Sequence, residues 1–258
     1  MQNVIEKIKE IQSGQVGLVV YSTKYENIIA SYNNDLYVPL ASAAKVAIGF
    51  AVAIMIKEKQ ISWDDILHQI KFDSKEDSVQ LYPHFQGRDT LSLSKAVEVM
   101  IACHDSLIAK SIVMHCGGWN DIRKYVSTYF SKIHVQENPI DEQNVGELNQ
   151  VHSLLIHIFR GYKSEPELWE PIINGMVTQQ GEYEGIPYYH IAHMTGGLPT
   201  AIINIGIMGM FDEYPILYVI GGKDLPNRFD NSEVDETVVS TLKCIYKKYN
   251  DGMLGVSD

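Results

Sequence analysis

Segments with the character of β-strands lie at both ends of this 258-residue chain, and the region between them is helical in character. The strand-like segments are rich in β-branched and aromatic residues and cover residues 15–21, 28–32, 188–194, 201–210 and 214–220. From residue 42 to about 180, apolar side chains recur mostly with helical spacing. We therefore predict one sheet built from both ends of the chain, with a block of helices inserted as a second lobe.

The predicted fold class is α/β (α+β), an antiparallel sheet flanked by terminal helices. Residues 1–10 have the pattern of an amphipathic helix, and Glu233–Tyr249 forms another apolar stripe, with Ser232 placed as its cap. The α/β lobe would comprise residues 1–40 and 181–258, and the helical lobe residues 41–180. We expect the two lobes to form a single domain.

Charge and hydropathy limit the partners of the chain. Its net charge of −11 argues against nucleic acid or an anionic membrane as the main partner. The longest apolar run, Val46–Ile56, is too short to cross a bilayer, and the N-terminal segment lacks the apolar core of a secretory signal. We expect a cytoplasmic monomer that acts on a small molecule.

The cysteines and histidines do not indicate a metal site. Cys103, Cys116 and Cys244 are odd in number and none belongs to a Cys-x-x-Cys pair, which is typical of free thiols in a reducing compartment. A catalytic cysteine is a minor alternative. His190 and His193 are spaced like ligands, yet no Cys/His cluster accompanies them. No metal or cofactor is expected.

Ser42 and Lys45 are the first candidate catalytic pair. Residues three apart share a face of a helix, so the hydroxyl and the amine can meet. The apolar run after Lys45 would desolvate the amine and lower its pKa toward neutrality, and a serine beside such a base is an activated nucleophile. The alternative is that Ser42 caps a core helix while Lys45 extends to water.

Two further polar segments could complete such a site. His104-Asp105-Ser106 interrupts two apolar helical segments, and His193 to Gly197 carries small residues at the end of a strand-like segment. Acyl transfer needs a group that protonates the leaving atom and donors that stabilise the oxyanion. These two segments can supply both.

The three segments, in this order, resemble the motifs of class A β-lactamases and penicillin-binding serine acyltransferases. That family carries Ser-x-x-Lys, Ser-Asp-Asn and Lys-Thr-Gly. Here Ser42-x-x-Lys45 is intact, residues 104–106 resemble the second motif, and residues 194–196 resemble the third. Residues 146–149 (Gly-Glu-Leu-Asn) are similar to the end of the family's Ω loop, so the likeness covers nearly the whole chain.

The resemblance implies a class A β-lactamase-like fold and assigns roles residue by residue. Ser42 would attack the carbonyl, Lys45 would accept its proton, and the backbone N–H groups of Ser42 and Gly197 would form the oxyanion hole. Thr195 would bind the substrate, and Asp105 would hold its loop.

Departures from the family motifs alter the expected chemistry. His104 replaces the serine that protonates the leaving nitrogen, and imidazole can do the same work; a purely structural histidine is the alternative. Ser106 replaces the asparagine and is expected to contact substrate with a shorter side chain. Met194 replaces the lysine that anchors a substrate carboxylate. Met194 is expected to contact substrate without a charge, so neutral esters or amides should lose less binding than substrates with that carboxylate. His193 is expected to point to the other face of its strand.

The expected group for deacylation is also altered. The alignment puts Val145 where the family has the glutamate that activates water. Glu147 could be recruited instead, although a surface carboxylate is the simpler interpretation. The aromatic residues Tyr82, His84 and Phe85 could form a pocket rim or could pack on the helical lobe.

The leading hypothesis is a serine hydrolase that forms an acyl-enzyme through Ser42, with Lys45 as base and His104 at the leaving group. Its substrate would be a lactam, amide or ester. A D,D-peptidase-like penicillin-binding acyltransferase is one alternative, disfavoured by the expected cytoplasmic location. A non-catalytic acyl sensor of the same fold is the other.

Overall fold

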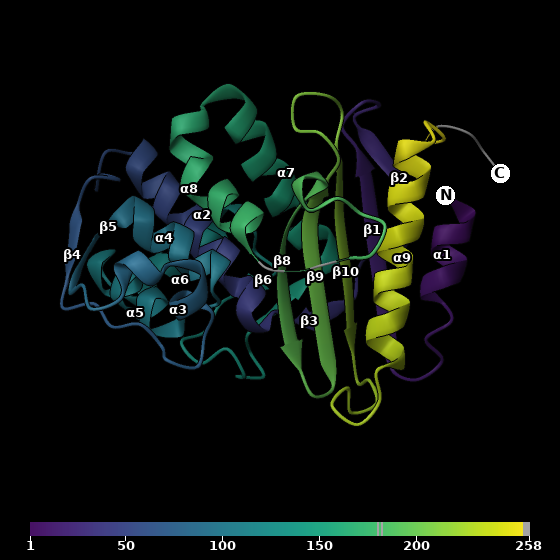
Figure 1. Ribbon diagram of the computed structural model, residues 1–258, viewed down its shortest axis with the longest axis horizontal. Coiled ribbons are helices and arrows are strands. Elements are labelled where there is room, and N and C mark those ends of the chain that lie inside the picture. The colour runs from purple at the N-terminus through teal and green to yellow at the C-terminus, as the bar shows by residue number, and fades with distance from the viewer. Residues whose placement is uncertain (180, 182, 255–258) are drawn as a thin grey trace.

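The computed structural model describes residues 1–179, 181 and 183–254 and contains a five-stranded sheet of order β2-β1-β10-β9-β8 (Figure 1). Its strands are β1 (Gln15–Ser22), β2 (Asn27–Tyr32), β8 (Ile191–Leu198), β9 (Ala201–Met208) and β10 (Ile216–Lys223). Every neighbouring pair is antiparallel. This confirms the prediction of one antiparallel sheet built from both ends of the chain.

The two ends of the chain meet in the middle of this sheet. Strand β1 pairs with β10 along its whole length, from Gln15 opposite Lys223 to Ser22 opposite Ile216. β1 is buried almost throughout and β10 is buried up to Gly222, so both faces of the sheet must be covered. Strand β8, at the edge of the sheet, faces the inserted helices.

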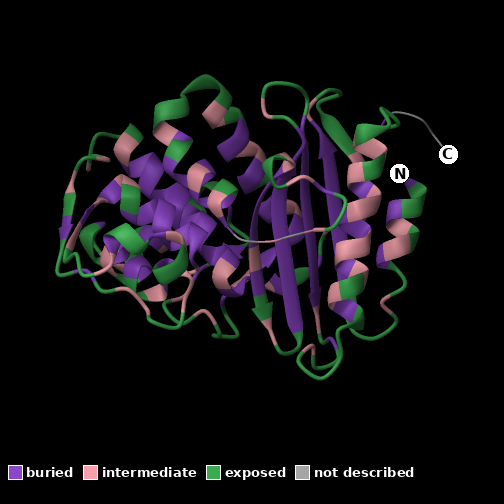
Figure 2. Cartoon of the chain, in the orientation of Figure 1, coloured by how far each residue is buried: buried purple, intermediate pink, exposed green. Residues whose placement is uncertain are grey.

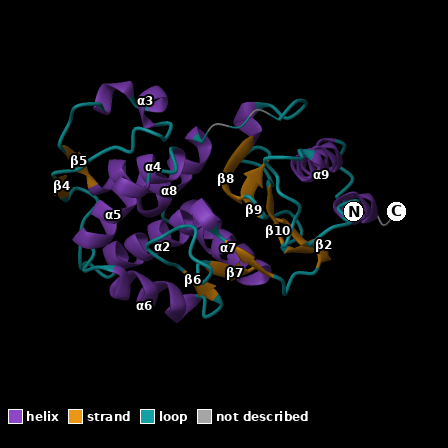
Figure 3. Cartoon of the chain, turned by 90° about the horizontal axis from the view of Figure 1, so that it is seen from below, coloured by secondary structure: helices purple, strands orange, loops and turns teal. Residues whose placement is uncertain are grey.

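Helices α1 (Gln2–Ile8) and α9 (Glu233–Asn250) cover one face of the sheet (Figures 1 and 3). Their apolar stripes, which include Val4 and Leu242, form a hydrophobic cluster with that face. Ser232 occupies the N-cap position of α9 as predicted, but its hydroxyl donates to Glu236 Oε1 at 2.6 Å and does not accept a backbone N–H.

The remaining elements form the helical lobe and its connections. Its helices are α2 (Ala44–Lys57), α3 (Ser78–Leu81), α4 (Leu93–Ala102), α5 (Ser106–His115), α6 (Trp119–Tyr129), α7 (Leu148–Ser164) and α8 (Pro166–Thr178). The short strands are β3 (Tyr37–Pro39), β4 (Ile66–His68), β5 (Thr90–Ser92), β6 (Ile133–His134) and β7 (Val145–Glu147). They form a three-stranded sheet, β3-β7-β6, and a two-stranded sheet, β4-β5.

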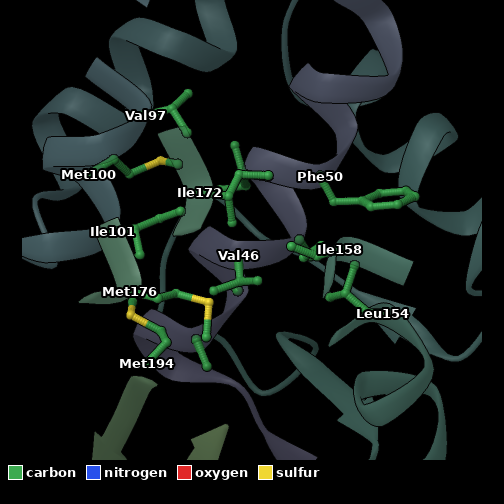
Figure 4. Packing of buried hydrophobic residues seen from close by; sticks show 14 of the residues in the cluster. Val46, Phe50, Val97, Met100, Ile101, Leu154, Ile158, Ile172, Met176 and Met194 are labelled. Carbon is green, nitrogen blue, oxygen red and sulfur yellow. The ribbon is translucent and has the colours of Figure 1, made fainter. Parts of the chain in front are cut away.

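Helix α2 is the centre of this lobe because it is apolar on every side. Its residues Ala44–Met55 are all buried, as expected for a helix with no polar face. Figure 4 shows Val46 and Phe50 of α2 among side chains from α4, α7 and α8, with Met194 of β8 at the lower edge. In Figure 2 the buried residues concentrate in these helices and in the central strands.

Several local features differ from the sequence prediction. Residues Tyr188–His190 form a short 3-10 helix, and strand β8 begins only at Ile191. Gln180, the last residue of the predicted helical lobe, lies outside the described residues, so the division of the chain at residues 40 and 181 stays a prediction. Within the described ranges, no helix is both long and apolar enough to span a membrane.

Candidate active site

Ser42 lies in a tight turn that leads into helix α2. The turn is a single 3-10 helix, η1 (Ala41–Ala43), and Ala43 is the N-cap of α2. Ser42 is therefore not the cap of this helix, and no side chain caps it. Ala41 has a positive φ of 45°, a conformation that costs a non-glycine residue about 1–3 kcal/mol and is often found at functional sites.

The amine of Lys45 contacts two hydroxyls. Its Nζ lies 3.3 Å from Ser42 Oγ and 3.3 Å from Ser106 Oγ. The Lys45 side chain is 3% exposed. Burial lowers its pKa from 10.5 to about 8, against the opposing charges of Glu76 and Asp105. A neutral amine within reach of the serine hydroxyl is therefore accessible near physiological pH, whereas a lysine extended to water is not observed.

Asp105 holds the segment between α4 and α5, as expected. Its carboxylate accepts the N–H groups of Leu107 and Ile108 at 2.9 Å each, which caps α5. The other oxygen accepts the Asp73 N–H at 2.9 Å and so fixes the segment that carries Glu76. Burial raises the pKa of Glu76, against the nearby Lys45 charge.

His104 follows the end of helix α4 in a left-handed conformation, with φ 57°. Glycine usually occupies such a position after a helix, so a histidine here is an unusual choice. Its Nε2 contacts Gln179 Nε2, and the same amide nitrogen donates to Thr195 Oγ1 at 3.4 Å. Burial lowers the pKa of His104 to about 4, with further contributions from Lys45 and His193.

Strand β8 passes very close to the backbone of the Ser42 turn. A Cβ at Gly196 would lie 2.2 Å from the Leu40 carbonyl oxygen and 3.1 Å from the Ala43 nitrogen. The absence of a side chain at this position is therefore what allows the approach. Thr195, beside it, is half-buried, and Gly197 is exposed.

Met194 does not have the position expected of a residue that contacts substrate. Its side chain has no exposed surface and packs in the core of the helical lobe, close to Met176 in Figure 4. Apolar packing holds the side chain away from solvent, so the expected contact between Met194 and substrate stays a prediction that this packing disfavours. His193 is buried as well, beside the Tyr183 ring.

The loop of residues 136–144 closes the other side of Lys45. A cavity of about 120 Å³ is lined by Lys45, Ser106, Gln136 and Glu137, among others. Asn144 ties this loop to the Ser42 turn, because its buried amide donates to the Ala41 carbonyl at 3.2 Å and to the Pro139 carbonyl at 3.0 Å.

Glu147 is neither a surface carboxylate nor a lining residue of that cavity. It is 5% exposed, pairs with Lys132 and belongs to strand β7, which is paired with β3. From the sequence, residues 145–149 were expected to correspond to the end of the family's Ω loop. In the structure, the segment that lines the cavity beside Lys45 is the 136–144 loop.

The remaining sequence candidates are the three cysteines and the aromatic residues around position 84. Cys103, Cys116 and Cys244 are free thiols, and burial raises the pKa of Cys103 and of Cys116 to about 12 each, which disfavours the nucleophilic thiolate. Tyr82 and Phe85 are buried and stacked, so the packing alternative is the correct one for them. The described residues include no group of three or more His, Cys, Asp or Glu side chains arranged to hold a metal.

Comparisons with known proteins identify the family of this chain. A profile of the beta-lactamase enzyme family matches residues 1–248. The chain belongs to the beta-lactamase enzyme family. This family member is 21% identical to the beta-lactamase VEB-1 of Pseudomonas aeruginosa, over 95% of its own length and 88% of the relative.

Solved structures of the family share the fold of this β-lactamase-family protein. PBP-A superposes with a TM-score of 0.77 at 15% identity, covering 97% of this chain and 95% of that one. An ancestral class A β-lactamase gives a TM-score of 0.75 at 14% identity, covering 95% and 98%. The predicted class A β-lactamase-like fold is thereby confirmed.

Sequence reasoning missed three residues of this site. Gln179 bridges His104 and Thr195, Asn144 holds the 136–144 loop to the Ser42 turn, and Glu76 lies near Lys45. None belongs to a motif, and their side chains are brought to the site only by tertiary packing. For Gln179 alone the sequence carried a signal, which was a polar residue at the end of an apolar helix.

Proposed function

We propose that this protein is a serine hydrolase that forms an acyl-enzyme through Ser42. The contact between Lys45 Nζ and Ser42 Oγ at 3.3 Å, with a buried amine, is the observation that supports it most. Neutral Lys45 takes the hydroxyl proton while Oγ attacks the substrate carbonyl. The backbone N–H groups of Ser42 and Gly197 stabilise the oxyanion, and Thr195 contacts the substrate.

The substrate is a neutral ester or amide in preference to a carboxylate-bearing lactam. Met194 offers no charge and is buried. Arg228 lies beside Gly197, but its guanidinium donates to the carbonyls of Leu198 and Ala201 and pairs with Asp235. An anionic substrate would have to compete with Asp235 for that cation.

Hydrolysis of the acyl-enzyme needs a base that activates water. Glu137 lines the cavity beside Lys45, whereas Glu147 is held by Lys132. Glu137 pairs with Lys110 at 3.4 Å, and both side chains remain more than half exposed, so this carboxylate can turn toward the cavity. We therefore favour Glu137 over Glu147 for deacylation.

A penicillin-binding acyltransferase is the second candidate. A mutant of PBP-A, which shares this fold, has been solved as an acyl-enzyme with penicillin G. In that case the acylated serine would persist. A non-catalytic acyl sensor would give the same persistent adduct.

The test compares the protein with Ser42→Ala and with a control, Ser111→Ala, whose hydroxyl bonds within helix α5. Each is incubated with an aryl ester, a penicillin and a cephalosporin, and turnover and intact mass are followed. We expect ester turnover and a transient adduct that only Ser42→Ala loses. A Ser42-dependent adduct that persists for hours favours the second candidate, and the absence of both adduct and turnover contradicts the nucleophile assignment.

Glu137→Gln and Glu147→Gln separate the two candidate bases. We expect Glu137→Gln to lengthen the lifetime of the adduct by about 100-fold or more and Glu147→Gln to leave the lifetime nearly unchanged. The reverse result would return the role to Glu147.

A further inference from the structure

Gln179 joins three segments at the edge of the candidate site. It follows the last residue of helix α8, and its backbone N–H donates to the Gly175 carbonyl at 3.1 Å. The side chain is 6% exposed. Its amide nitrogen contacts His104 Nε2, from the segment between α4 and α5, and donates to Thr195 Oγ1 of strand β8.

The direction of these hydrogen bonds decides where the imidazole carries its proton. The Gln179 amide nitrogen faces Nε2 of the ring, and the amide oxygen is buried without a hydrogen-bond partner among the described residues. An NH₂ group only donates, so in this orientation of the amide Nε2 must accept. A neutral imidazole whose Nε2 accepts carries its single proton on Nδ1. The ring stays neutral because it is buried and has the Lys45 amine and His193 near it. The neighbouring Asp105 carboxylate is occupied by three backbone N–H groups.

We propose that Gln179 is a positioning residue, which occupies His104 Nε2 and so presents His104 to the substrate as an Nδ1–H donor. The conformation of His104 supports a functional role, because its positive φ carries a cost that a glycine at this position would avoid. The effect on catalysis rests on the proposed function. The protonation state of the His104 ring, which is measured first, does not depend on it.

A chemical preference follows from this arrangement. With Nε2 occupied, His104 offers the leaving atom a hydrogen bond and has no second ring nitrogen through which to relay a proton. An alkoxide or phenolate of low basicity can depart with a hydrogen bond alone, whereas an amine must take a full proton before it leaves. Gln179 therefore biases the site toward esters over amides.

The test is nitrogen–proton correlation NMR of the imidazole rings in the full chain, with His104 assigned through His104→Gln. Near neutral pH we expect the wild-type ring to be neutral with its proton on Nδ1. Gln179→Leu removes the donor and should give a mixture of tautomers. Gln179→Glu introduces an acceptor, which should move the proton to Nε2 and raise the pKa of His104 by about 1–3 units.

A control and a kinetic measurement complete the design. Gln150→Leu alters another partly buried glutamine, on helix α7, and should leave the His104 signals unchanged. With an aryl ester and an anilide of the same acyl group, we expect wild type to prefer the ester, and Gln179→Leu to reduce ester kcat/KM roughly tenfold.

The outcomes distinguish this inference from the proposed function. A wild-type proton on Nε2, or a tautomer unaffected by both Gln179 variants, overturns the positioning role even if Ser42 is the nucleophile. If Ser42→Ala retains full activity while the tautomer responds as expected, the proposed function fails and the assignment of Gln179 to His104 stands.

Discussion

At the scale of single residues, burial of Lys45 lowers the stability of the folded protein and makes the amine a better base. A cation that is 3% exposed has lost most of its hydration, and the two serine hydroxyls replace water only in part. The resulting fall of its pKa from 10.5 to about 8 is the property that makes it a base near neutral pH. Burial of the cation must therefore destabilise the folded state.

Lys45→Met should abolish acylation and increase stability. The folded-state pKa lies below the unfolded value, so the penalty of burying the charge is fully present below about pH 8 and disappears as the pH rises toward 10.5. The shift corresponds to about 3 kcal/mol at neutral pH. Allowing for the lost contacts to Ser42 and Ser106, we expect a net gain of about 1–3 kcal/mol.

Urea unfolding across this pH range measures the effect. Wild-type stability should rise relative to that of Lys45→Met between about pH 8 and 10.5. A constant difference between the two proteins would mean that Lys45 is not the group that titrates in this range.

At the scale of elements, the site depends on the approach of strand β8 to the turn η1. A Cβ at Gly196 would overlap the Leu40 carbonyl oxygen. This close approach brings the part of β8 that carries Gly197 next to the turn that carries Ser42, although the two residues are far apart in the sequence.

Gly196→Ala should therefore separate the proposed oxyanion donors. We expect a loss of about 1–3 kcal/mol in stability and a fall of about 100-fold or more in acylation rate, since a displacement near 1 Å has such an effect. Rates from intact-mass time courses and thermal melts measure the two quantities. A Cβ introduced by Gly222→Ala, in β10 of the same sheet, would lie 3.0 Å from a Val16 methyl and 3.2 Å from both the Gln15 carbonyl oxygen and a Leu225 methyl. This variant should change stability alone. Equal acylation by both variants would contradict this account.

The sequence was informative about elements with strong local patterns. The strands are β-branched and apolar, residues 46–56 of helix α2 include no polar side chain, and the Ser42-x-x-Lys45 spacing is local, so all were predictable from neighbours in the chain. The pairing of β7 with β3 is not local. It holds Glu147 in a strand, and not in the loop position that the comparison with the family's Ω loop had suggested. Gln179 and Asn144 act through residues 75 and 103 positions away, a separation that carries no signal in one sequence.

At the scale of the whole molecule, the sheet separates two hydrophobic clusters. One surrounds α2 and reaches the candidate site, and the other lies under α1 and α9. The second cluster stabilises the sheet without touching Ser42 or Lys45. Stability and chemistry should therefore be separable by substitutions on opposite faces.

Leu242→Ala tests this separation. Leu242 is fully buried in the cluster under α9, and its truncation should lower the free energy of unfolding by about 2–5 kcal/mol. The acylation rate of the remaining folded protein should stay within about twofold of wild type. Chemical denaturation and active-site titration measure the two quantities, and a parallel loss of rate would show that the clusters are coupled through the sheet.

The pairing of β1 with β10 also constrains the order in which the protein can fold. Strand β1, which begins at Gln15, cannot pair with β10 until Lys223 has been synthesised. Contacts between residues so far apart in the sequence form slowly. During synthesis the β1–β2 hairpin exposes apolar faces until strand β10 has emerged from the ribosome. The protein should therefore depend on chaperones for its yield more than its final stability suggests, and a weakened β10 should reduce expression before it reduces activity.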